Sequence, residues 1–333
     1  MHKYAKELKE PSKIDGLTHQ HKPNSEATLM GVNVKINDFG IRDNFTPRPK
    51  EKNEYRILVL GNSITLGWGV QYDYIFTTLF ENKLNETYSN LRFEVINSGI
   101  GNYNTVMESI YLKSILQDVN PNEIILHFYI NDIERISQKK SNFLVKHSYL
   151  FAYIYLNFKQ SAIINFSNFN STGKYYLDLY TGENEDRSKA QNAILSINDL
   201  CFQNDIKFKV LIQPDLHDLS YDSDQFKCHL IIRKFLENNS SIIKCISSNI
   251  IDKNLKTTFN ALISTNSMTP KLFGTPLMTK YRNLINDKYL ATYVALDLYY
   301  AKLFDVNLAD INFNKPQPLD FNVVPPKANK ENQ

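Results

Sequence analysis

Residues 56–70 read RILVLGNSITLGWGV, and this stretch decides the fold class. The apolar run at 57–60 is short and continuous, which is typical of a strand that is buried on both faces. It ends at Gly61 and leads into a longer amphipathic segment, residues 73–88, which has the pattern of a helix. The stretch therefore predicts a strand–turn–helix unit with Ser63 on the turn.

Similar units recur along the chain. Further apolar runs predict strands at 93–96, 123–130, 208–213 and about 242–251. Helical patterns follow at 105–118, 187–204, 223–239 and 287–304. Buried strands that alternate with helices indicate a parallel sheet with helices on both faces. We therefore predict the α/β class: a three-layer α/β/α sandwich around a flavodoxin-like, doubly wound sheet of about five parallel strands.

The pattern of elements also suggests domain boundaries. We expect an N-terminal arm with a short strand over 1–53 and one α/β domain over 54–305. Residues 139–185 are irregular and rich in Asn, Ser, Phe and Tyr, so we interpret them as an insertion or lid of that domain. Residues 306–333 contain PQP and VPP and are expected to form a flexible tail.

Composition excludes several classes of protein. The 38 Lys and Arg residues nearly balance the 35 Asp and Glu residues, so the charge does not favour a nucleic-acid partner. No signal-peptide pattern and no apolar run of membrane-spanning length is found, so we expect no membrane span and a cytoplasmic location, with loss of an upstream anchor left open. The three cysteines form no zinc pattern, and we expect neither a metal nor a cofactor.

Reactive groups of a doubly wound sheet lie at the carboxyl ends of its strands. Ser63 follows the first strand on a turn that exposes its oxygen at a helix N-terminus, which suits a nucleophile. Small residues at 97–105 follow the second strand and can point a backbone N–H at a substrate oxygen. Asn131 follows the third strand and can donate from a neutral amide. Helix caps and an ordinary tight turn are the simpler interpretations.

Three stretches together carry a family resemblance. RILVLGNSITLGWGV, EVINSGIGNYNT at 94–105 and LHFYINDIE at 126–134 resemble, in order and spacing, the first three blocks of the SGNH/GDSL hydrolase superfamily. NDFGIRD at 37–43 is also similar to the segment before the first block in bacterial, polysaccharide-associated members. Asn62 departs from the pattern, because that position is usually Asp.

The resemblance implies a serine esterase or acyltransferase that acts on O-acyl groups of a small molecule or a glycan. Ser63 would be the nucleophile. Its own N–H, a backbone N–H of Gly101 or Asn102, and the side chain of Asn131 would bind the oxyanion.

The expected catalytic base is missing from its usual place. The last block of the superfamily is Asp-x-x-His before the final helix, whereas residues 281–289 read YRNLINDKY. His217, on the loop after the fourth strand, is a candidate replacement, with Asp215 or Asp218 to orient it. An exposed loop histidine is the simpler interpretation.

Other functions stay open beside a rerouted esterase. Without a base, the chain would be a catalytically inactive SGNH-fold protein that binds a glycan or serves as a scaffold. A nucleotide or flavin binder is disfavoured, because the first loop lacks GxGxxG.

Overall fold

The computed structural model describes residues 2–136, 172–182, 185–213, 223–239 and 244–247. These ranges belong to one compact unit, Met1–Asn249. The predicted tail at 306–333, the predicted helix at 287–304 and most of the predicted lid lie outside the described residues. The domain boundaries therefore stay predictions.

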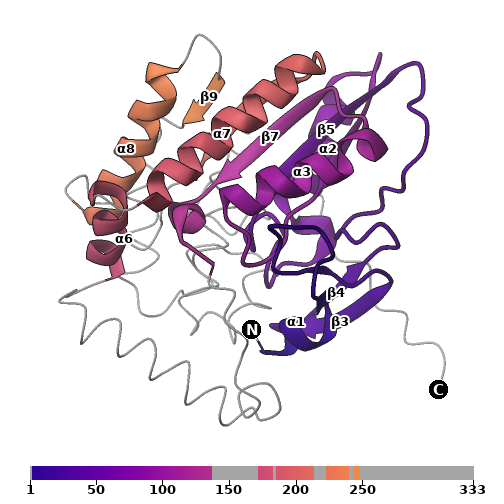
Figure 1. Cartoon of the computed structure of the whole chain (residues 1–333). Helices are drawn as coiled ribbons and strands as arrows, with labels where there is room; N and C mark the ends of the chain where they lie inside the picture. The colour runs from indigo at the N-terminus through magenta and orange to yellow at the C-terminus, as the bar shows by residue number, and fades with distance from the viewer. Residues whose placement is uncertain (1, 137–171, 183–184, 214–222, 240–243, 248–333) are drawn as a thin grey trace, which may run out of the picture. The chain divides into compact units, whose positions relative to one another are not determined.

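Five parallel strands form the central sheet, as the sequence predicts (Figure 1). They are β5 (Glu54–Gly61), β6 (Arg92–Asn97), β7 (Glu123–Phe128), β8 (Lys207–Ile212) and β9 (Lys244–Ser247). The spatial order is β6-β5-β7-β8-β9, and every neighbouring pair is parallel. This is the flavodoxin-like order, in which the chain reverses its direction across the sheet between the first and third strands. The reversal here falls between β5 and β7.

Helices connect the successive strands and cover the sheet. They are α2 (Phe76–Thr87), α3 (Thr105–Val119), α7 (Glu185–Gln203) and α8 (Asp224–Asn238). α3 packs against α7 on one face (Figure 1). The connection from β5 to β6 runs in the opposite direction along the sheet, so a right-handed crossover places α2 on the other face. α6 (Thr172–Thr181), at the end of the predicted insertion, packs against α8.

The buried strands account for the apolar runs in the sequence. Every residue of β7 is buried, and Leu58, Leu60 and Leu126 have no exposed surface. Helices on both faces remove the solvent-facing side that would otherwise require alternating polar residues. The core therefore forms where the carboxyl ends of β5 and β7 can be held in fixed positions.

The N-terminal arm is more regular than the extended segment predicted for residues 1–30. It forms helix α1 (His2–Glu7), the hairpin of β1 (Lys9–Glu10) with β2 (Gln20–His21), and the hairpin of β3 (Ser25–Leu29) with β4 (Val32–Ile36). Tyr4 and Leu8 are fully buried in a cluster that also contains Leu66 of the Ser63 loop. Tertiary burial therefore orders a segment whose local pattern is weak.

The NDFGIRD segment packs beneath the loop that carries Ser63. The Arg42 guanidinium is 1% exposed and donates to the carbonyl oxygens of Leu66 at 2.8 Å, Gly67 at 2.7 Å and Val70 at 2.6 Å. Three carbonyl groups left without donors in this interior would each be costly. Arg42 thus fixes the backbone just after Ser63.

We expect Arg42→Met to destabilise the fold by about 3 kcal/mol or more, because it removes three donors from buried carbonyl groups. Arg92→Met is the matched control: Arg92 forms an exposed ion pair with Glu51, and its loss should cost about 1 kcal/mol at most. Urea unfolding of both variants measures the difference. Equal destabilisation by the two substitutions would contradict the role given to Arg42.

His21 ties the arm to the segment that contains Arg42. Its side chain is buried, its Nδ1 hydrogen-bonds the Gly40 carbonyl at 3.1 Å, and its Nε2 lies 2.7 Å from the Tyr4 hydroxyl. A carbonyl oxygen only accepts, so Nδ1 carries the proton and Nε2 accepts from Tyr4. Burial lowers the pKa of His21 to about 3.

The lowered pKa predicts a loss of stability in acid. Below pH about 6.5 the unfolded chain protonates His21 while the folded chain does not, so unfolding becomes more favourable as pH falls. Wild type should therefore lose more stability between pH 7.5 and pH 5 than His21→Gln, whose side chain does not titrate. Urea midpoints of the two proteins at both pH values test this. A difference between the proteins that does not change with pH would contradict it.

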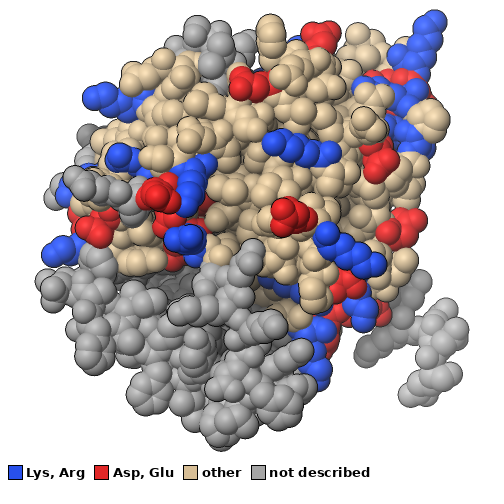
Figure 2. All heavy atoms as spheres, in the orientation of Figure 1, with Lys and Arg blue, Asp and Glu red and all other residues tan. Residues whose placement is uncertain are grey.

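Charged side chains are mixed in sign over the described surface. Figure 2 shows Lys and Arg interspersed with Asp and Glu on this face, without a large patch of either sign. Among the described residues, no helix combines the length and the apolar character that crossing a membrane requires. The described residues also contain no group of three or more His, Cys, Asp or Glu side chains that could hold a metal ion.

Candidate active site

The residues singled out from the sequence meet at the carboxyl edge of the sheet. Ser63 follows β5 and Asn131 follows β7, and these strands flank the reversal point where ligands bind in such sheets. The Ile100 N–H donates to the Gly61 carbonyl at 3.0 Å, and the Asn62 amide donates to the Asn131 side chain at 3.0 Å. Direct hydrogen bonds thus join the loops that carry Ser63, Asn102 and Asn131.

Two glycines allow this close approach. A Cβ on Gly99 would lie 2.3 Å from the backbone nitrogen of Leu66, and one on Gly61 would lie 2.0 Å from the Thr65 hydroxyl oxygen. Real Cβ atoms do not make contacts this short. The second loop can therefore close on the first only because these positions lack side chains.

Asn62 sets the orientation of the Asn131 amide. The Ile64 N–H donates to Asn62 Oδ1 at 2.8 Å, so Asn62 turns its Nδ2 toward Asn131 Oδ1 at 3.0 Å and Asp132 Oδ1 at 2.6 Å. Asn131 presents its oxygen to Asn62, which leaves its Nδ2 available to another acceptor. An ionised Asp at position 62 could not make either donation.

Three donors around Ser63 are left without partners in the described part of the chain. They are the backbone N–H groups of Ser63 and Asn102 and the Nδ2 of Asn131. The Ser63 hydroxyl likewise has no hydrogen-bond partner among these residues. Unpaired donors near a hydroxyl provide what a developing oxyanion needs.

The second loop resolves which of two backbone groups is available. The Gly101 N–H already donates to the Tyr4 hydroxyl at 2.8 Å. Asn102 has φ 69°, a left-handed conformation that glycine adopts most easily and that Asn tolerates best among other residues. Of the two predicted donors, Asn102 is therefore the one with an unpaired N–H in the described structure.

No described histidine takes the place of the missing base. The four described histidine side chains, at 19, 21, 127 and 229, make no hydrogen bond to Ser63. His127 lies in the core, where it contacts the Thr65 hydroxyl at 2.8 Å, and burial lowers its pKa to about 4. The predicted base His217 and its predicted orienting residue Asp215 both lie outside the described residues.

Two buried carboxyl groups lie beneath the Asn62–Asn131 pair. Asp132 accepts from Asn62 and from the Tyr129 N–H at 2.7 Å, and burial raises its pKa to about 7. Glu108 is also buried, neither of its oxygens has a hydrogen-bond partner among the described residues, and burial raises its pKa well above the usual range. A third carboxylate at position 62 would add a like charge beside them.

We expect Asn62→Asp to destabilise the fold by about 2 kcal/mol or more at pH 8 and by less at pH 5. The introduced carboxylate faces Asp132, and repulsion grows as both groups lose protons with rising pH. Asn90→Asp, in an exposed loop, is the matched control and should change little at either pH. Thermal unfolding at the two pH values provides the measurement. A cost that is independent of pH would show that position 62 does not face a titrating carboxyl group.

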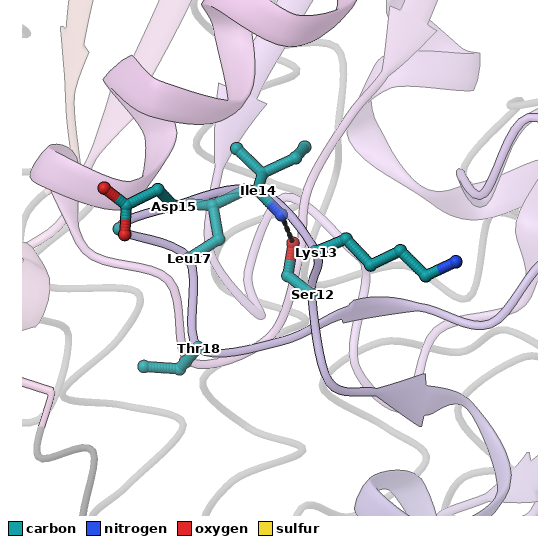
Figure 3. Close-up of a pocket in the computed structure, with 7 residues that line it drawn as sticks. Ser12, Lys13, Ile14, Asp15, Leu17 and Thr18 are labelled. Atoms are coloured by element: carbon teal, nitrogen blue, oxygen red, sulfur yellow. Dashed lines mark hydrogen bonds between the residues drawn. The ribbon is translucent and has the colours of Figure 1, made fainter.

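A cavity of about 430 Å³ lies beside the arm, lined by residues 12–18 (Figure 3). The Ile14 N–H donates to the Ser12 hydroxyl, while Lys13 and Asp15 point in opposite directions (Figure 3). None of the residues predicted for the site lines this cavity. The cavity therefore does not supply a second constellation of converging groups.

Sequence reasoning missed the arm residues that contact the second loop. Tyr4, Lys9 and His19 all hydrogen-bond Gly101, across 82 to 97 positions of the chain. No local pattern links a polar N-terminal segment to a distant glycine. The only signal was the presence of two histidines, His19 and His21, near one another in the arm.

No family model matches the chain, and no curated protein matches it in sequence. Several solved structures are similar. TesA is 9% identical with a TM-score of 0.36, over 75% of this chain and 99% of TesA. AlinE4, an SGNH-hydrolase family esterase, is 13% identical with a TM-score of 0.35, over 65% of this chain and 98% of AlinE4.

The acetyl xylan esterase AlAXEase is 16% identical with a TM-score of 0.34, over 74% of this chain and 98% of that chain. At these identities and TM-scores the likeness does not assign an activity to this chain. The proteins found nevertheless include members of the superfamily that the three sequence blocks resemble.

Proposed function

We propose that the chain is an SGNH-type serine ester hydrolase or acyltransferase that acts on O-acyl groups, with carbohydrates as the carriers. The observation that carries the proposal is the set of three unpaired donors beside Ser63: its own N–H, the Asn102 N–H and Asn131 Nδ2. The choice of carbohydrate rests on the NDFGIRD segment, which is similar to that of polysaccharide-associated members of the superfamily.

The proposed reaction begins with attack of the Ser63 oxygen on the ester carbonyl carbon. The carbonyl oxygen becomes an oxyanion, and the three donors stabilise it. Collapse of the tetrahedral intermediate releases the alcohol and leaves an acyl group on Ser63. Water or a second hydroxyl then takes the acyl group, which distinguishes a hydrolase from an acyltransferase.

The base in this reaction is a separate proposal. His217 would remove the Ser63 proton, with Asp215 to hold the ring. Its support is the sequence position on the loop after β8, at the same edge of the sheet as Ser63. Without a base, an oxyanion hole alone retains about 10³–10⁴-fold catalysis over water, so measurable activity does not require His217.

A second candidate function is that of a catalytically inactive protein that binds an acylated glycan. The observation that favours it is the lack of any described histidine bonded to Ser63. Such a protein would retain the donors for binding a carbonyl group. It would show no turnover and no effect of Ser63 on ester consumption.

Hydrolysis of short-chain p-nitrophenyl esters tests the proposal. Ser63→Ala should reduce the rate by about 10²-fold or more, because it removes the nucleophile. Ser114→Ala is the matched control, since Ser114 lies on α3 and its hydroxyl bonds the Tyr111 carbonyl. Asn131→Ala should cost about 10²–10³-fold through the loss of one oxyanion donor. His217→Ala reports on the base.

The outcomes separate the two functions. Loss of activity in Ser63→Ala but not in Ser114→Ala supports a serine esterase. Equal rates in wild type and Ser63→Ala would contradict it, and binding of an acetylated oligosaccharide by both proteins would then favour the inactive binder.

A further inference from the structure

The arm holds the second loop on both sides of Gly101. On one side, the Gly101 N–H donates to the Tyr4 hydroxyl at 2.8 Å. On the other, Lys9 Nζ donates to the Gly101 carbonyl at 2.6 Å, and His19 Nε2 lies 3.0 Å from the same oxygen. Lys9 also donates to Asn102 Oδ1 at 2.9 Å. Residues of one short segment thus engage every polar backbone atom of Gly101.

The directions of these hydrogen bonds are determined by their partners. The Tyr4 hydroxyl gives its proton to His21 Nε2, so its oxygen is free to accept from Gly101. His19 must donate from Nε2 to a carbonyl oxygen, and its Nδ1 then accepts from the Thr18 hydroxyl at 2.7 Å. All of these side chains lie between α1 and β2, which the β1–β2 pairing of Lys9 with His21 brings together.

Peptide geometry carries this contact to the site. The Gly101 carbonyl and the Asn102 N–H belong to one planar trans peptide group, so they point in opposite directions. Holding the carbonyl toward Lys9 and His19 therefore directs the Asn102 N–H away from the arm. That N–H is one of the three unpaired donors described above.

We propose that the N-terminal arm forms part of the oxyanion hole, with Lys9 as a positioning residue that aims the Asn102 N–H through the Gly101 carbonyl. The inference rests on the proposed function and names a structural requirement of that site. The cationic amine also polarises the shared peptide, which makes the Asn102 N–H a stronger donor.

The charge of Lys9 gives the proposal a distinctive pH dependence. The titratable groups that face it are Tyr4, whose ring centroid lies 4.4 Å from Nζ, and the two histidines His19 and His21. No carboxylate pairs with it among the described residues. Burial lowers the pKa of Lys9 to about 7, so the amine loses its charge as pH rises through neutrality.

Three variants of the full chain test the role of Lys9. Lys9→Met removes the donor, Lys9→Arg keeps a permanent charge, and Lys6→Met is the matched control on the exposed side of α1. The first measurement is amide hydrogen exchange of a peptide that covers residues 98–104. The second is kcat and KM for a p-nitrophenyl ester between pH 6 and pH 9.

We expect Lys9→Met to accelerate exchange in that peptide about tenfold, because the clamp on the loop is lost. We also expect kcat to fall about tenfold or more with KM within about twofold, because the misaimed donor acts in the transition state. In wild type, kcat should decline above pH about 7, whereas Lys9→Arg should recover most of the activity and lack this decline. Lys6→Met should match wild type in both measurements.

Contrary results overturn the inference in separable ways. Unchanged exchange at residues 98–104 in Lys9→Met would show that Lys9 does not hold the loop, whatever the activity. Faster exchange with an unchanged kcat would show that the loop does not aim an oxyanion donor. If wild type hydrolyses no ester, the proposed function fails, and the exchange result alone still decides whether the clamp exists.

Discussion

The hydrogen bonds of the Asn62 side chain are the constraint on which the candidate site depends. One amide accepts from the backbone of its own turn and donates to both Asn131 and Asp132. This arrangement joins the ends of β5 and β7 and leaves the Asn131 nitrogen available. It also explains the departure from the usual Asp at this position: beside two buried carboxyl groups, a neutral donor adds no like charge.

Two further layers of contacts hold the same edge of the sheet. Below Ser63, Arg42 binds three carbonyl groups of the loop that follows, so the NDFGIRD segment has a structural reason to accompany the first block. Beside Ser63, the arm engages Gly101 through Tyr4, Lys9 and His19. Residues from the first 45 positions thus support loops that follow β5 and β6, and the arm is better understood as a part of the site than as an appendage.

Prediction from the sequence succeeded where the signal was local and periodic. The run at 57–60 lies within β5, and the helix predicted at 105–118 is α3, because continuous burial and helical periodicity are properties of neighbouring residues. Prediction was weaker for residues 1–30, where burial of Tyr4 and Leu8 against Leu66 orders the chain. It also left Gly101 and Asn102 as alternatives, since the Tyr4 contact that occupies the Gly101 N–H spans 97 positions.

The sequence by itself determined the class of fold and the three strand ends at which reactive groups gather, because both follow from patterns within a few residues. Its empty histidine position at 281–289 also raised the question of the base without help from any structure. Only the tertiary structure decided which donors are unpaired, which way the Asn131 amide turns, and that the N-terminal arm reaches the second loop. These depend on hydrogen bonds between segments far apart in the chain, and a pattern of neighbours carries no information about such partners.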